Sequence, residues 1–468
     1  MDVLPLGWRY PGGGPLFPAP SLEELAARRA QLSTLSKSAR RLGTSPWTFD
    51  ERKVVRQPNL SEPAEVGWMC LVAAADPQRE RIAAALEPLA AHRAMNGEPL
   101  VYPASTPDWI DEGYLGLGDN RPAYVLLAGD PVHLPFSLQV DLAAAGAIVG
   151  RVAFDKIADL KAYVAKVVAC EDKANDPRPQ ATAVVLAPEA KGDVTTYSRR
   201  FMAEPVARLL NGEANLMSVD LLGPDATAAN LLATLSQSRP AIVFTASHGA
   251  GVPTTDGAKK QRKVNGAIGC EPPAGSSATD WDWLRAEDLP DAPFCPGGIV
   301  VQFACFGGGT SDRSSYAAWL GPDGSNEFDA KEPFVAALPK ALLAHPDGPV
   351  AHVGHVDVAV LHGFDDPAAP VPAGGDAHPR LEPFKTLVRR AVAELTPVGF
   401  ALRDLHARAA SMSATIATTV DRLQQRGIEV AGMAAADRDA FLDLFIRRND
   451  AMHFLLLGDP AARIRIDG

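Results

Sequence analysis

Two short segments of this chain each end in a side chain that can do chemistry. Residues 241–249 read AIVFTASHG, and residues 298–309 read GIVVQFACFGGG. Apolar, β-branched runs of this length predict buried parallel strands, and ligands bind where such strands end. The first strand would bring the imidazole of His248, and the second the thiol of Cys305, to the same edge of one sheet. A thiol beside an imidazole forms a nucleophile with its base, so the pair predicts a cysteine hydrolase.

The glycines that follow both side chains strengthen this prediction. Gly249 permits close approach of another backbone and leaves its own N–H free to point at a ligand. A structural cysteine does not need three glycines after its strand, whereas a nucleophile approached by a peptide does, so we expect Gly307 and Gly308 to contact the substrate. The backbone N–H groups of Gly249 and Cys305 are the expected oxyanion hole. No third, orienting carboxylate is evident from the spacing.

The composition of the chain limits the classes of protein to which it can belong. The chain has 468 residues, 47% hydrophobic and 22% charged, which is ordinary for a globular protein of two or three packed units. Its net charge of −11 argues against a general nucleic-acid binder. Five scattered cysteines do not form a disulfide framework, and we see no signal peptide and no membrane-spanning run. We therefore expect a cytoplasmic protein with no nucleic-acid or membrane partner.

Strands alternate with helices along most of the chain, which predicts an α/β fold with a mostly parallel sheet. We expect an N-terminal extension over residues 1–60, with one helix over 22–35. An α/β subdomain is expected over 61–178, a catalytic subdomain over 179–375, and a helical segment with a C-terminal return strand over 376–468. The expected strands and helices are, in chain order, strands 66–73, 124–128, 183–187, 216–221, 241–246, 299–304, 350–360, 452–460 and 464–466, and helices 77–93, 194–210, 226–237 and 332–344.

Strand-Ser-His-Gly followed by strand-Ala-Cys resembles the caspase-like superfamily of cysteine peptidases. The segments 124–130, 149–151, 354–357 and 457–460 (YVLLAGD, VGR, GHVD and LGDP) are similar to its gingipain-type branch and the related CHAT proteins. The resemblance implies a three-layer α/β/α fold of two adjoining subdomains, with His248 and Cys305 as the catalytic dyad. It also implies cleavage of a protein substrate after one chosen P1 side chain. Bacterial relatives often serve in regulated proteolysis, including defence, so we expect a protein activator or regulator.

In gingipain-like enzymes that cut after Arg, an acidic residue after the first strand of the catalytic subdomain fills the S1 pocket. By that resemblance, Asp193 is the better candidate here and Glu189 the weaker, and Asp357 lies near the expected rim. These carboxylates favour a basic P1 residue, Arg or Lys. The alternative for each is a solvated loop carboxylate.

A basic stretch lies between the two dyad residues and is expected to be an exposed loop. If the S1 pocket is acidic, this stretch is also a candidate for self-cleavage, at Lys259, Lys260, Arg262 or Lys263.

The sequence predicts neither a cofactor nor a metal site. His352 and His355 lie on one strand at a spacing that points them to opposite faces, which opposes shared metal ligation. Two functions from other classes stay open: a catalytically silent, peptidase-like scaffold or adaptor, and a cysteine hydrolase or acyltransferase that acts on a small molecule.

Overall fold

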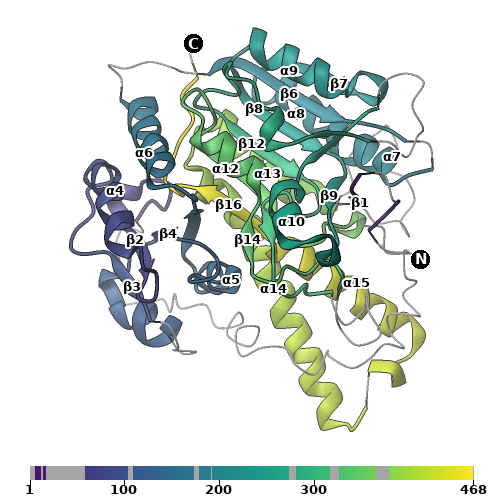
Figure 1. Ribbon diagram of the computed structural model, residues 1–468. Coiled ribbons are helices and arrows are strands. Elements are labelled where there is room, and N and C mark those ends of the chain that lie inside the picture. The colour runs from purple at the N-terminus through teal and green to yellow at the C-terminus, as the bar shows by residue number, and fades with distance from the viewer. Residues whose placement is uncertain are drawn as a thin grey trace.

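The computed structural model describes residues 6–11, 14–16, 58–103, 109–172, 179–190, 192–272, 281–316, 326–364, 379–428 and 430–466 (Figure 1). The predicted helix over 22–35 lies outside these residues.

A ten-stranded sheet forms the centre of the molecule, in the order β3-β2-β4-β5-β16-β15-β12-β8-β6-β7. Its strands, in chain order, are β2 (Trp68–Ala73), β3 (Leu100–Tyr102), β4 (Tyr124–Ala128), β5 (Ile148–Val152), β6 (Gln180–Ala187), β7 (Met217–Leu222), β8 (Pro240–Ala246), β12 (Ile299–Phe303), β15 (Ala351–His355) and β16 (Phe454–Gly458).

The sheet consists of two parallel halves that run in opposite directions. Strands β3, β2, β4, β5 and β16 pair in parallel, and so do β15, β12, β8, β6 and β7. The two halves meet where β16 pairs antiparallel with β15. The C-terminal strand therefore joins the two halves into one continuous sheet (Figure 1).

Helices cover both faces of the sheet because successive strand residues point to opposite sides. On β6, Ala183 and Val185 join the large core cluster formed with α4, α6, α8 and α13. Val184 joins a second cluster, under α9 and α12. In the first half, α5 covers a third cluster with β2 and β4. The helices are α4 (Arg79–His92), α5 (Phe136–Ala144), α6 (Ile157–Glu171), α8 (Glu204–Gly212), α9 (Ala228–Gln237), α12 (Ala337–Ala344) and α13 (Glu382–Val388).

Two longer helices follow α13, namely α14 (Val398–Gln425) and α15 (Ala435–Met452), and they pack against each other. They extend beyond the sheet in Figure 1. None of the helices among the described residues is long and apolar enough to cross a membrane.

A small four-stranded sheet, in the order β1-β9-β10-β11, lies beside the second half of the main sheet (Figure 1). Its strands are β1 (Gly7–Arg9), β9 (Gly249–Gly251), β10 (Ile268–Cys270) and β11 (Asp282–Leu284). β9 begins one residue after His248, so this sheet is built directly onto the predicted catalytic edge.

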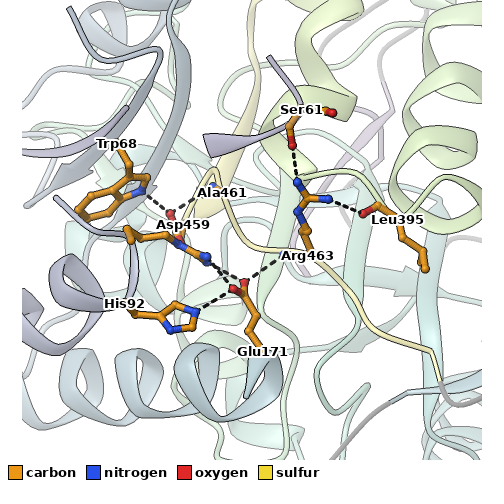
Figure 2. A network of polar contacts seen from close by, with 9 residues as sticks. Ser61, Trp68, His92, Glu171, Leu395, Asp459, Ala461 and Arg463 are labelled. Atoms are coloured by element: carbon orange, nitrogen blue, oxygen red, sulfur yellow. Dashed lines mark hydrogen bonds and ion pairs between the residues drawn. The ribbon is translucent and has the colours of Figure 1, made fainter. Parts of the chain in front are cut away.

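A buried polar network fixes the turn after β16 to the first half of the molecule (Figure 2). Asp459 Oδ1 accepts a hydrogen bond from Trp68 Nε1 at 2.8 Å, and Asp459 Oδ2 accepts one from Arg93 Nε at 2.7 Å. Arg93 also binds both oxygens of Glu171, at 2.6 and 2.7 Å, and His92 Nε2 lies 2.9 Å from Glu171 Oε2. The Gly-Asp-Pro segment that ends β16 is therefore part of the fold's framework.

The α/β fold with a mostly parallel sheet is confirmed, together with most predicted strands. Two element predictions are wrong. Residues 464–466 form no strand, and the basic stretch is not a loop but helix α10 (Ala258–Val264). Good helix formers fill α10, and the buried side chain of Gln261 ties it down by donating to the carbonyls of Val252 and Phe328.

Candidate active site

Strands β8 and β12 bring the two predicted reactive side chains to the same edge of the sheet. They pair in parallel, and the last matched positions are Ala246 and Phe303. His248 and Cys305 each follow two residues later, on strands that lie about 4.8 Å apart. Both side chains are buried, at 1% and 0% exposure. The structure therefore places the imidazole and the thiol at equivalent positions on neighbouring strand ends.

Gly249 crosses the backbone of Cys305 at very short range. A Cβ atom at position 249 would lie 1.9 Å from the carbonyl oxygen of Cys305, so only glycine fits there. This close crossing brings together the two N–H groups predicted as an oxyanion hole. Both donate to one carbonyl oxygen, that of Leu6, with N···O distances of 3.1 Å from Gly249 and 2.9 Å from Cys305.

A carboxylate orients the imidazole of His248. Asp193 Oδ1 lies 2.8 Å from His248 Nε2 and also accepts hydrogen bonds from the N–H and hydroxyl groups of Thr195, at 2.9 and 2.8 Å. Burial acts to raise the pKa of Asp193, but the neighbouring His248 and the Thr195 hydrogen bonds outweigh it and hold this pKa below its usual value. Asp193 is therefore ionised at neutral pH and faces the histidine.

The other imidazole nitrogen of His248 is left available. Within the described part of the chain, Nδ1 is buried and has no hydrogen-bond partner. The rings of Trp8 and Trp281 flank the imidazole, with centroids 5.1 and 5.0 Å away. With Nε2 bound to Asp193, Nδ1 is the nitrogen that can exchange a proton with a thiol.

Cys305 is covered by other parts of the chain. Its Sγ lies 3.5 Å from the carbonyl oxygen of Ala359, to which the S–H group donates. A Cβ added to Gly7 would lie 2.7 Å from this sulfur, so the chain passes directly over the thiol at Gly7. Burial raises the pKa of Cys305 well above its ordinary value, and the nearby carboxylates of Asp357 and Asp450 raise it further. In this covered arrangement the thiol is protonated.

The glycines after Cys305 serve the packing of the turn. Gly308 donates its N–H to the carbonyl of His355 at 2.8 Å, and a Cβ there would lie 2.8 Å from the carbonyl oxygen of Gly354. A Cβ at Gly307 would lie 2.9 Å from the side chain of Gln302, and the Gly307 N–H bonds to the carbonyl of Ala304 at 3.3 Å. Both N–H groups are therefore used within the protein, and contact of these glycines with a substrate stays a prediction.

The remaining predicted acids have partners inside the protein. Asp357 is buried and accepts four hydrogen bonds at 2.7–2.9 Å, from the hydroxyls of Ser314 and Ser315 and from the N–H groups of Ser315 and Val358. Glu189 pairs with Arg199. The structure thus brings Asp193 to His248, whereas Asp357 organises a neighbouring turn and Glu189 forms an ion pair.

Three of the four basic residues of α10 have carboxylate partners. Lys260 pairs with Asp256 at 2.8 Å, and Arg262 with Glu332 at 3.1 Å. Lys263 contacts Glu287, and Lys259 lies in the first turn of the helix. Peptidases bind their substrates as extended chains, so self-cleavage here, which stays a prediction, would require α10 to unwind.

A cavity of about 480 Å³ lies apart from the dyad. Its lining includes Phe136 of α5, His406 and Ser413 of α14 and Arg448 of α15, but neither His248 nor Cys305.

The two histidines for which the sequence opposes shared metal ligation each contact a backbone carbonyl. His352 Nε2 lies 3.2 Å from the carbonyl oxygen of Gly307, and His355 Nε2 lies 3.0 Å from that of Asp450.

Sequence reasoning missed two parts of this site. One is Asp193 as the partner of His248. The other is the N-terminal segment that carries Leu6, Gly7 and Trp8. A loop carboxylate and a Pro/Gly-rich N-terminus carry no pattern that indicates such contacts, because both depend on the path of the chain in space.

Comparison with known proteins gives structural neighbours only. No protein-family model matches the sequence, and no curated protein matches it significantly. The crystal structure of the Arg-specific cysteine proteinase gingipain R is similar at 13% identity and a TM-score of 0.48, over 86% of this chain and 78% of that one. The complex of Porphyromonas gingivalis RgpB pro- and mature domains (13%, 0.44, 85% and 80%) and a structure described as a protease (13%, 0.49, 85% and 78%) are also similar.

Proposed function

We propose that this protein is a cysteine endopeptidase in which Cys305 is the nucleophile and His248 its base. One observation carries the proposal: the N–H groups of Gly249 and Cys305 converge on a single carbonyl oxygen, next to the thiol and the imidazole. Two converging donors are what the oxyanion of an acyl-transfer reaction requires. A buried cysteine with a purely structural role has no need of them.

The reaction follows from these positions. His248 takes the thiol proton on Nδ1 as Sγ attacks the carbonyl carbon of the substrate. The carbonyl oxygen becomes an oxyanion held by the two N–H groups. When the C–N bond breaks, His248 returns the proton to the leaving amine, and the acyl group stays on Sγ as a thioester. Water then adds to the thioester, the acid is released and the thiol is restored.

Asp193 would act as a positioning residue. Its hydrogen bond to Nε2 fixes the imidazole plane and leaves Nδ1 for proton transfer. Its negative charge also stabilises the imidazolium formed during attack.

Cleavage after Arg or Lys would need a carboxylate in the S1 pocket that is free to pair with the substrate. Asp193, Glu189 and Asp357 each bind a partner within the protein. A preference for a basic P1 residue therefore stays a prediction that requires one of these carboxylates to exchange its present partner for the substrate.

The direct test is a library of fluorogenic peptides varied at P1, incubated with the wild type, Cys305→Ala and His248→Ala. We expect cleavage by the wild type and a loss of at least about 10³-fold in both variants, as for removal of a nucleophile or its base. Cleavage that persists in Cys305→Ala refutes the nucleophile assignment. A folded protein that cleaves no peptide, even when Cys305 is accessible to alkylation, would support the scaffold alternative.

A further inference from the structure

The N-terminal segment lies in the candidate active site. β1 pairs in parallel with β9, so that Gly7, Trp8 and Arg9 face Gly249, Ala250 and Gly251. Figure 1 shows β1 beside β9, near the N-terminal end of the trace. The strand that follows His248 therefore holds the start of the same chain.

Leu6 makes the backbone contacts expected of a bound P1 residue. Its carbonyl oxygen receives the two N–H groups of Gly249 and Cys305, and its own N–H donates to the carbonyl of Ala359 at 2.9 Å. A substrate carbonyl must occupy the oxyanion hole for attack to occur. Because Gly7 then passes over Sγ, the Leu6–Gly7 peptide bond takes the place of a scissile bond.

The side chain of Leu6 is fully buried, at 0% exposure, and belongs to the main apolar core. An apolar side chain stabilises a complex by leaving water, whereas burial of an unpaired Arg or Lys at the same place would be costly.

The two residues after Gly7 anchor the segment through their side chains. Trp8 packs against His248 and Trp281. The Arg9 guanidinium lies 5.0 Å above the ring of Phe328, pairs with Glu327, and donates to the carbonyl of Leu16 at 3.2 Å.

Leu16 returns over the same region. A Cβ at Gly251 would lie 2.2 Å from Leu16 Cδ2, and one at Gly7 would lie 2.2 Å from Leu16 Cδ1. The segment thus covers Cys305 with an extended strand and a second apolar layer.

We propose that residues 6–11 and 14–16 are a built-in occupant of the substrate cleft, which lowers the activity of the peptidase until displaced, and that Leu6 marks an S1 pocket for leucine-like P1 residues. This inference rests on the proposed function, which makes the region around Cys305 a substrate cleft. Because the occupant belongs to the same chain, it competes at a high effective concentration with any free substrate. Displacement of the segment would expose Cys305 and the oxyanion hole together.

The test uses Gly7→Val in the full chain, with two readouts. A side chain at position 7 clashes with Cys305 Sγ and Leu16, so the segment must leave the cleft, while no predicted catalytic group changes. Gly212→Val is the matched control, because a Cβ there meets nothing within 4 Å. Arg9→Glu is a second displacing variant, since it places like charges together at Glu327 without adding bulk over the thiol.

The first readout is the rate at which iodoacetamide alkylates Cys305, followed by peptide mass spectrometry. We expect alkylation at least about 10-fold faster in Gly7→Val and Arg9→Glu than in the wild type and Gly212→Val. A synthetic peptide with the sequence of residues 3–10 should slow it again. Equal rates in all four proteins would overturn the occupant proposal.

The second readout compares two fluorogenic peptides, Val-Leu-Pro-Leu and Val-Leu-Pro-Arg, in the same proteins. We expect the displacing variants to cleave the Leu peptide at least about 10-fold faster than the wild type does, and faster than they cleave the Arg peptide. Preference for the Arg peptide would overturn the assignment of S1. Faster alkylation with cleavage of neither peptide would support the occupant and refute the proposed peptidase function, so the two failures are distinguishable.

Discussion

Replacement of Asp193 by Asn separates the two roles that this carboxylate could have. Asn keeps the size of the side chain and an oxygen for Thr195, but it removes the charge that faces His248 Nε2 at 2.8 Å. If Asp193 positions the histidine, the substitution must slow the chemical step for every substrate. If Asp193 is instead the acid of an S1 pocket, only peptides with a basic P1 residue should be affected.

The size of the effect follows from the hydrogen bond that is lost. A hydrogen bond to a charged group contributes about 1.5–3 kcal/mol. Each 1.36 kcal/mol of transition-state stabilisation is worth a factor of ten in rate. We therefore expect kcat to fall by about 10- to 200-fold with little change in KM, and by the same factor for Leu and Arg peptides.

The assay measures kcat and KM separately for both peptides in the Gly7→Val background, where the cleft is open. Asp256→Asn is the control, because it removes an exposed carboxylate paired with Lys260 and should change the rates less than about twofold. A loss confined to the Arg peptide, mainly in KM, would refute the positioning role.

Three further predictions concern stability, each measured by denaturant unfolding. Arg93→Met leaves the buried carboxylates of Glu171 and Asp459 without their shared partner, so we expect the free energy of unfolding to fall by about 3–5 kcal/mol; a change below about 1 kcal/mol would contradict this. Burial acts to raise the pKa of Glu171, but His92 and Arg93 lower it to about 2. The ionised Glu171 therefore adds to the free energy of unfolding above its unfolded pKa of about 4.3, and this contribution is lost as the pH falls toward 2. Glu171→Gln should therefore lose less stability than the wild type over that pH interval. If the free energy of unfolding falls with pH equally in both proteins, the result would count against the ion pair. Phe303→Ala empties the centre of a cluster of rings at 5.1–5.5 Å, and we expect a loss of about 3–5 kcal/mol, against less than about 1 kcal/mol for exposed Met217→Ala.

Much of the fold could be predicted because its signals are local. The run from Ala241 to Ala246 is apolar at every position but Thr245, as a strand buried on both faces must be, and β8 covers nearly the same residues. Strands 148–152 and 249–251 are not among the predicted strands, because Gly150 and Arg151 interrupt the apolar pattern of the first and two of the three residues of the second are glycine. The basic stretch differs from the predicted loop because lysines and arginines dominate its composition, whereas the geometry of α10 depends on the buried side chains of Gln261 and Val264.

The candidate active site likewise has one part that local sequence predicts and another that depends on the tertiary structure. The sequence by itself determined that a histidine and a cysteine follow two buried strands, and parallel strands carry their ends to one edge whatever the rest of the chain does. Only the tertiary structure decided that Asp193, 55 residues before His248, faces its imidazole, and that Leu6 occupies the two N–H groups beside Cys305. The physical reason is that strand identity follows from the side chains of neighbouring residues. A contact between distant segments instead depends on how every intervening element packs.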